Sequence, residues 1–301
     1  MDGESASRLS AAEVLGLDEP AARTLPLVLA SPHSGKDYPA DFVAASRLDA
    51  LALRQSEDSY VDELFGAAPH LGAPLLPARF PRAYLDVNRE AYELDPAMFS
   101  DALPSFANVG SPRVRLGLGT IARVVATGEE IYAGKLRFAD AEQRIEGLYH
   151  PYHEVLRRLL DETDGIFGGY LLLDCHSMPS SSCRGCDGAD IVLGDCFGSA
   201  CAPRIVAAAR GFLAERGFKV GINAPYAGGF TTGFYGRPGE HRHALQIEIN
   251  RALYMDERNY RRTPGFAQLA AHLADLVEHL SRAVQECLPK TARQEVQESL
   301  R

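Results

Sequence analysis

A series of short apolar runs, each followed by a polar turn, most constrains how this chain can fold. We expect strands at residues 25–31, 75–78, 83–87, 170–174, 191–193, 218–221 and 244–249. Runs that are apolar throughout are typical of strands covered on both faces. Helical periodicity predicts helices at residues 59–71, 139–163, 203–216 and 264–286. This alternation predicts an α/β fold in which a sheet is layered between helices.

The chain has neither an internal repeat nor a low-complexity linker, so we expect one domain. We place an N-terminal extension at residues 1–22, a single domain at 23–288 and a polar C-terminal tail at 289–301. Pro151 is expected to interrupt or kink the helix at 139–163, because proline lacks the backbone N–H that a helix interior needs.

The overall charge and the cysteine content exclude several classes of protein. A formal net charge of -9 argues against a general nucleic-acid binder, which usually carries a basic face. No apolar run approaches the roughly 18–20 residues that span a bilayer, and the acidic N-terminus lacks the features of a secretory signal. Six cysteines are too few for a disulfide scaffold in a chain of 301 residues. We expect a cytoplasmic protein with reduced thiols; the sequence does not predict its oligomeric state.

Two histidines directly follow expected strands, His33 in Ser-Pro-His-Ser-Gly and His176 in Asp-Cys-His-Ser. Strand ends in α/β sheets gather functional residues, and catalytic zinc is commonly held by imidazole and carboxylate ligands. The adjacent pair Glu57 and Asp58 is the obvious source of a carboxylate. The alternative is that each histidine is a hydrogen-bonded structural residue, and spacing alone does not separate the two interpretations.

Glu248 stands in the middle of the apolar stretch Ala-Leu-Gln-Ile-Glu-Ile. Burying a carboxylate there costs free energy unless it is paired or lies near a cation. One interpretation is a buried ion pair with Arg251 or another arginine. The other is a general base that removes a proton from the attacking water of a metal-dependent hydrolase.

Three arginines surround the expected strand at 83–87, namely Arg79, Arg82 and Arg89. Guanidinium groups bind carboxylates through two parallel hydrogen bonds, so this grouping favours an anion site. The alternative is that they are ordinary surface arginines. The acidic character of the whole chain makes a local arginine cluster more informative.

Two further motifs are weaker. Cys183 and Cys186 have the spacing of a zinc pair, but no second pair accompanies them, so we interpret them as incidental thiols of a loop. Ser34 and Ser177 are possible nucleophiles, although neither lies in a Gly-x-Ser-x-Gly elbow. A serine hydrolase therefore stays an open alternative.

Seven segments in order resemble the N-formylglutamate amidohydrolase family, also called N-formylglutamate deformylases. They are SPHSGKDYP, EDSYVDELF, PRAYLDVNR, LLLDCHSMP, ADIVLGD, NAPYAGG and LQIEINRALYMDE. The resemblance covers the chain from about residue 25 to 260. It implies a zinc hydrolase related to the metallocarboxypeptidases, with a three-layer α/β/α sandwich around a mixed sheet, so that residues 23–288 would be one zinc-hydrolase domain.

Carried over residue by residue, the resemblance implies a metal site. His33 and His176 are similar to the two imidazole ligands. Asp58 is similar to the carboxylate ligand, because the family has an Asp two residues before an aromatic there, with Glu57 as the open alternative. Glu248 occupies the position of the general base. The carboxypeptidase pattern His-x-x-Glu is absent, since Lys36 stands three residues after His33, and the carboxylate must come from elsewhere.

The resemblance also implies a substrate-binding set. Asn88 and Arg89 are similar to an Asn-Arg pair that holds a substrate carboxylate, and Arg82 is the candidate to polarise the amide oxygen. Arg251 is expected to bind substrate as well. The candidates to meet the glutamate side chain, without a ranking, are Arg113, Arg115, Arg184 and Arg251.

The implied reaction is hydrolysis of N-formyl-L-glutamate to formate and L-glutamate, a step of histidine catabolism, with Zn²⁺ as cofactor. The expected partner is this small acidic amide, with neither nucleic acid nor a membrane. One alternative is an amidohydrolase or carboxypeptidase-like enzyme for another N-acyl amino acid or a small peptide. Another is a catalytically silent ligand-binding relative.

Overall fold

The computed structural model describes residues 15–185 and 188–289, without the side chains at 183–185. The chain separates into two compact units. The first contains residues 15–17, Gly35–Glu57 and Ala78–Val155. The second contains Asp18–Ser34, Asp58–Pro77 and residues 156–289. The expected boundaries at 22 and 288, and the expected single domain between them, stay predictions.

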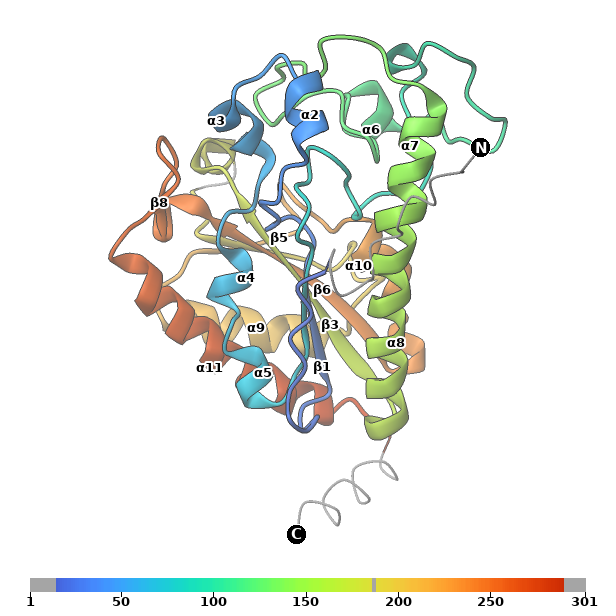
Figure 1. The fold of residues 1–301 in the computed structure, drawn as a ribbon. Coiled ribbons are helices and arrows are strands. Elements are labelled where there is room, and N and C mark those ends of the chain that lie inside the picture. The colour runs from blue at the N-terminus through green and yellow to red at the C-terminus, as the bar shows by residue number, and fades with distance from the viewer. Residues whose placement is uncertain (1–14, 186–187, 290–301) are drawn as a thin grey trace. The chain divides into compact units, whose positions relative to one another are not determined.

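A six-stranded sheet lies entirely in the second unit (Figure 1). Its strands, in spatial order, are β2 (Leu75–Pro77), β1 (Leu27–Ser31), β3 (Tyr170–Met178), β6 (Arg242–Asn250), β4 (Ile191–Gly194) and β5 (Val220–Ile222). Neighbouring strands are parallel except for β4 and β6, which are antiparallel. The predicted α/β class with a mixed sheet is confirmed.

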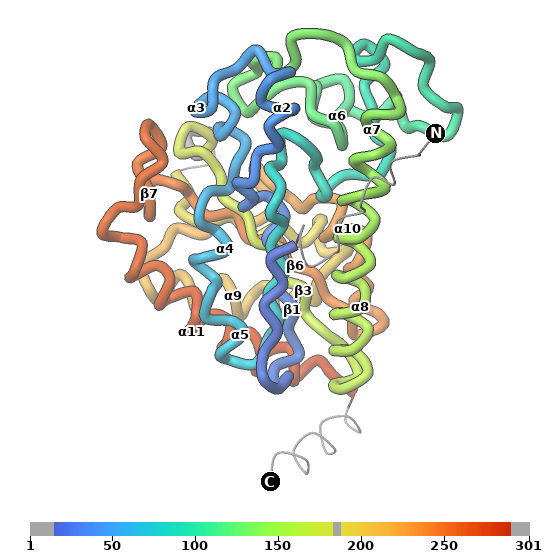
Figure 2. The backbone as a smooth tube through the Cα atoms, in the orientation of Figure 1, coloured from blue at the N-terminus to red at the C-terminus, as the bar shows by residue number. Residues whose placement is uncertain are grey.

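One face of this sheet is covered by a layer of helices, and side chains of strands and helices form one apolar cluster there. The helices are α4 (Val61–Leu64), α5 (Ala68–Leu71), α9 (Pro203–Glu215) and α11 (Gly265–Gln285). In Figure 2 they lie together on one side of the sheet. Fully burying a leucine or isoleucine contributes about 1.5–3 kcal/mol, so this layer supplies much of the stability of the second unit.

The opposite face carries α10 (Phe230–Tyr235), which packs against β3 and β6. The helix α8 (His150–Phe167) lies on the same side in Figure 1, opposite α9 and α11. An ion pair of 2.7 Å between Arg242 Nη2 and Asp164 Oδ2 connects β6 to this helix. Helices on both faces agree with a three-layer sandwich. None of the helices in the described residues has the length and apolar character of a membrane span.

The first unit contains short helices and no strand of the six-stranded sheet. Its α-helices are α2 (Ala40–Ala45), α3 (Ala50–Leu53), α6 (Pro112–Arg115) and α7 (Phe138–Arg144). The remaining short elements of the chain are the 3-10 helices η1 (Arg54–Ser56), η2 (Pro96–Met98), η4 (Ser180–Gly185), η5 (Pro238–Glu240) and η6 (Arg251–Leu253), and the strand pair β7 (Met255–Asp256) and β8 (Arg261–Arg262).

Two sequence-based expectations are wrong, and a third is confirmed close to the expected position. The helix at 59–71 is two short helices, α4 and α5. The expected strand at 83–87 is a turn, in which the backbone N–H groups of Tyr84 and Leu85 donate to the Pro81 carbonyl. The expected helix at 139–163 runs from α7 into α8 through a π-helical turn (Ile145–Tyr149) that ends two residues before Pro151, so the regular α-helix is interrupted next to this proline, as expected.

Candidate metal centre

The central strands β3 and β6 carry polar side chains on one face. Side chains alternate across a strand, so Asp174 and His176 point to the same face of β3, and Gln246 and Glu248 to the same face of β6. The strands are in register, with Asp174 opposite Gln246 and His176 opposite Glu248. The residues that alternate with them along the two strands belong to the apolar cluster of the other face: Leu173, Cys175, Leu245, Ile247 and Ile249. A buried polar strip therefore lies on the face that α10 covers.

His33, Asp58 and His176 meet at the end of this strip. All three are buried, and their possible ligand atoms lie within 4.8 Å of one another. Asp58 Oδ2 is 3.1 Å from His176 Nδ1 and 3.3 Å from His33 Nδ1. The Asp58 backbone N–H donates to the His33 carbonyl at 2.9 Å, which holds the two segments together. Two imidazoles and a carboxylate in this arrangement could hold a metal ion.

The electrostatics of this group favour a positive charge. Burial by itself would raise the pKa of Asp58, but hydrogen bonds and charges from His176 and His33 lower it well below the usual value. Burial by itself would lower the pKa of His176, but the charge and hydrogen bond of Asp174 raise it well above the usual value. The site therefore keeps an ionised Asp58 and attracts either a proton on His176 or a metal ion.

The second oxygen of Asp58 is held by neighbouring donors. Ser177 Oγ and Arg251 Nη2 each donate to Asp58 Oδ1 at 3.1 Å, and Arg251 Nε donates to Ser177 Oγ at 3.1 Å. Burial alone would lower the pKa of Arg251, but the charge of Asp58 raises it. Arg251 was expected to bind substrate. Its guanidinium instead contacts Asp58 Oδ1, the oxygen that does not face the two histidines. Its substrate-binding role stays a prediction.

Asp174 is a functional candidate that sequence reasoning missed. It is fully buried, and its Oδ1 lies 2.9 Å from His176 Nε2, the nitrogen that does not face Asp58. Thr232 Oγ1, from α10, donates to Asp174 Oδ2 at 3.0 Å. The available signal was the spacing Asp-x-His within one strand, which puts both side chains on one face.

Glu248 lies beside His176 on the neighbouring strand and is 7% exposed. Its Oε1 accepts a hydrogen bond of 2.8 Å from Gln246 Nε2. The charge of Glu248 contributes to raising the pKa of His176, as expected for a carboxylate close to that ring. The expected general base is therefore on the same polar strip as one of the expected ligands.

In the first unit, two of the three expected arginines, Arg82 and Arg89, meet at Asp86. Its Oδ2 lies 2.9 Å from Arg82 Nε and 3.3 Å from Arg89 Nη2, and its Oδ1 accepts from the Asn88 backbone N–H at 2.9 Å. Burial lowers the pKa of Arg89 to about 10, a result that already includes the raising effect of the Asp86 charge and the lowering effects of the Arg82 and Arg113 charges. A buried cation among like charges is stabilised by an added anion.

A family model described as N-formylglutamate amidohydrolase matches residues 25–255. The chain belongs to this family. An N-formylglutamate deformylase from Pseudomonas putida is 30% identical over 238 residues, which cover 77% of this chain and 83% of that protein. A protein of the same name from Pseudomonas aeruginosa PAO1 is 29% identical over 270 residues, covering 88% of this chain and 91% of its own length.

A solved structure supports the same assignment. The crystal structure of N-formylglutamate amidohydrolase from Ralstonia eutropha JMP134 has a TM-score of 0.85 and 38% sequence identity, and the match covers 91% of this chain and 99% of that chain. A gene product from Agrobacterium tumefaciens has a TM-score of 0.63 at 19% identity, covering 89% and 94%, and shows likeness of fold alone. The resemblance inferred from the seven motifs is confirmed.

The sequence left open whether Glu57 or Asp58 is the candidate carboxylate ligand, and the two side chains have different contacts. The Glu57 carboxylate accepts hydrogen bonds of 3.0 and 2.9 Å from Arg54 Nε and Nη2, and Tyr38 donates to it at 3.3 Å. Asp58, not Glu57, shares the cluster with the two histidines. The contacts favour Asp58 as the metal ligand.

The serine and cysteine motifs have different outcomes. Ser34 Oγ forms a short contact with Ser31 Oγ and accepts from the Asp62 backbone N–H at 3.2 Å. Neither Ser34 nor Ser177 hydrogen-bonds a histidine among the described residues, so neither has the base that a serine nucleophile needs. The side chains of Cys183 and Cys186 lie outside the described residues, as does that of Arg184, and their roles stay predictions.

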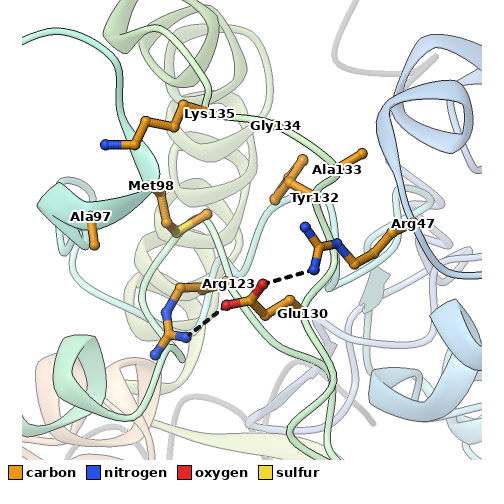
Figure 3. A pocket seen from close by; sticks show the side chains of 9 residues that line it. All are labelled: Arg47, Ala97, Met98, Arg123, Glu130, Tyr132, Ala133, Gly134 and Lys135. Atoms are coloured by element: carbon orange, nitrogen blue, oxygen red, sulfur yellow. Dashed lines mark hydrogen bonds and ion pairs between the residues drawn. The ribbon is translucent and has the colours of Figure 1, made fainter.

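A small cavity of about 230 Å³ lies in the first unit (Figure 3). Arg47 and Arg123 reach into it, and Glu130 bridges them at 3.0 Å and 3.6 Å. Ligand pockets usually measure roughly 300–1,000 Å³. Because Glu130 already provides the carboxylate that these arginines would bind, this cavity does not identify a substrate site.

Proposed function

We propose that this protein is a zinc-dependent amidohydrolase that converts N-formyl-L-glutamate and water to formate and L-glutamate. The observation that carries the proposal is the cluster of His33, Asp58 and His176 beside Glu248 on the adjacent strand. The substrate is supported by the names of the relatives from two Pseudomonas species and Ralstonia. A cytoplasmic location and a place in histidine catabolism stay predictions.

The donor atoms fit a divalent metal ion. When neutral His176 donates its Nε2–H to Asp174, its Nδ1 is an acceptor. Nδ1 and Asp58 Oδ2, which are 3.1 Å apart, then repel each other unless they share a positive charge. The cluster and its buried neighbours contain three carboxyl groups, Asp58, Asp174 and Glu248. Arg251 supplies one permanent positive charge to this hydrogen-bonded group, so a divalent cation would offset the remaining two formal charges.

When bound there, zinc would polarise an amide carbonyl and lower the pKa of water towards about 7. Glu248 accepts a proton from the attacking water and later delivers it to the departing amine. A C–O bond to the formyl carbon forms, the C–N bond breaks, and the amine leaves protonated. Gln246, which donates to Glu248 Oε1, orients the carboxylate for this transfer.

Substrate recognition is proposed for the residues that the family resemblance implies. Arg89 with Asn88 holds the α-carboxylate, and Arg82 stabilises the negative charge that develops on the amide oxygen. Among the four arginines proposed for the glutamate side chain, Arg113 is the best candidate, because its charge acts on Arg89. Within the described residues, the Arg113 guanidinium forms no ion pair that would occupy it.

The test is a substrate panel on purified protein, stripped of metal by a chelator and reloaded with Zn²⁺. We expect formate from N-formyl-L-glutamate, loss of activity on chelation and recovery on reloading. N-acetyl-L-glutamate, which differs by one methyl group, and N-formyl-L-glutamine, which lacks the side-chain charge, are the matched controls.

Preference for N-acetyl-L-glutamate or a small peptide would refute the formyl substrate while keeping the amidohydrolase. Activity that survives complete chelation would refute the metal-dependent mechanism. Binding without turnover would indicate a catalytically silent relative.

A further inference from the structure

We propose that Asp174 is a positioning residue of the metal centre, which holds the His176 ring so that Nδ1 faces the cation. This inference rests on the proposed function and extends it to a residue outside the three ligands. Asp174 and His176 are two residues apart on β3, and the carboxylate Oδ1 lies 2.9 Å from Nε2. The same ring presents Nδ1 to Asp58 Oδ2 at 3.1 Å.

The contact with Asp174 selects one tautomer of the histidine. An ionised carboxylate is an acceptor only, so the facing Nε2 must carry the proton and donate it. In the neutral ring, Nδ1 then has the free lone pair, which is the form that a metal requires. Outer carboxylates of this kind orient ligating histidines and raise their basicity.

Asp174 is itself fixed from the opposite side. Thr232 Oγ1 donates to its second oxygen at 3.0 Å, and both residues are fully buried. Thr232 belongs to α10, whose start is set by the turn at Gly228, where φ is 129°. A side chain at this glycine would come within 2.6 Å of Cys196 Sγ as well as adopt a disfavoured conformation. The turn thus places Thr232 behind the carboxylate.

The ligand Asp58 has an equivalent arrangement, with Ser177 and Arg251 donating to its outer oxygen. In both ligands, one polar atom faces the cluster and the other is held by a buried neighbour. Two independently anchored ligands indicate a preorganised site, in which little side-chain freedom is lost when the cation binds.

Zinc affinity of the metal-free protein distinguishes a positioning role from a purely structural one. We would titrate Zn²⁺ in competition with a chromophoric chelator for wild type, Asp174→Asn and Thr232→Val. We expect Asp174→Asn to raise the Kd about 10- to 100-fold, because the amide can donate to Nε2 and favour the wrong tautomer. Thr232→Val keeps the carboxylate charge and removes only its anchor, so we expect a smaller increase, about 3- to 10-fold.

The matched control is Asp164→Asn, which removes another paired carboxylate of the same unit, bound to Arg242. We expect its Kd to equal that of wild type. The visible absorption bands of bound Co²⁺ provide a second measurement, which should change in the Asp174 and Thr232 variants and not in the control.

A Kd for Asp174→Asn within about twofold of wild type would overturn the proposal. If that variant does not fold, as judged by far-UV circular dichroism, Thr232→Val and Thr232→Ser decide. Weaker binding by the valine variant with wild-type binding by the serine variant supports the inference, and unchanged binding by both overturns it. Failure of the proposed function is separate, because it shows in the wild type as absent zinc binding or absent formate.

Discussion

The two faces of β3 and β6 differ although the same strands form them. On one face Leu173, Cys175 and Ile247 pack in the apolar cluster beneath α9 and α11. On the other, Asp174, His176 and Glu248 form a buried polar strip. Because neighbouring residues of a strand point in opposite directions, one backbone places candidate metal ligands against a rigid apolar layer. The apolar face contributes to the stability of the fold, and the polar face carries the residues that we propose for catalysis.

The largest expected effect comes from the polar face. Glu248→Gln keeps the shape of the side chain and removes the base, so we expect kcat to fall about 10²- to 10⁴-fold. Zinc content and the melting temperature should stay close to those of wild type. Steady-state kinetics with N-formyl-L-glutamate and metal analysis of the same sample measure both quantities.

The control is Glu215→Gln, which makes the same chemical change at an exposed position near the end of α9. Its kinetics should match wild type. An unchanged kcat in Glu248→Gln would remove Glu248 from the mechanism, and the chemical distinction between the two faces would fail with it.

The next effect comes from the apolar face. Leu173 is fully buried in the apolar cluster. We expect Leu173→Ala to lower the free energy of unfolding by about 2–5 kcal/mol, because it leaves a cavity. The folded fraction should retain wild-type zinc affinity. Urea denaturation and zinc competition measure the two effects.

Leu173→Met is the volume-conserving control, with an expected cost under about 1.5 kcal/mol. If Leu173→Ala weakened zinc binding as strongly as Asp174→Asn while the protein stayed folded, the two faces would not be separable.

The smallest effect concerns a histidine on the apolar face. His243 is 1% exposed, and neither ring nitrogen has a hydrogen-bond partner among the described residues. Burial, with a contribution from His241, lowers the pKa of His243 to about 4. The ordinary value is about 6.5, so the unfolded chain binds the proton first. Stability is then complete above about pH 6.5 and decreases as the pH falls towards 4.

At pH 5 we expect His243 to reduce the free energy of unfolding by about 1–2 kcal/mol relative to pH 7.5. His243→Leu should lose this part of the pH dependence, and urea denaturation of both proteins at the two pH values measures it. Equal pH dependence of the free energy of unfolding in both proteins would contradict the lowered pKa of His243.

The α/β class follows from local sequence, because runs that are buried on both sides are apolar at every position. The errors lie where tertiary contacts outweigh local propensity. Within the described part of the chain, the run at 83–87 has no strand partner, and its backbone forms a turn that is hydrogen-bonded to Pro81. The strand β3 extends past the expected end at residue 174, because it pairs with β6 as far as Met178. The periodicity of the sequence does not predict where a strand forms or ends, because both depend on which neighbouring strand is available for pairing.

By itself, the sequence determined the family and the polar residues that could carry chemistry, since the ordered motifs and the buried Glu248 are visible in the chain. Only the tertiary structure decided which of them meet. It joined Asp58, rather than Glu57, to His33 and His176, and it placed Asp174 in contact with His176 and Arg251 in contact with Asp58. The reason is geometric, because β3 and the segments at 33 and 58 are far apart in sequence, and the approach of their side chains depends on strand order and register.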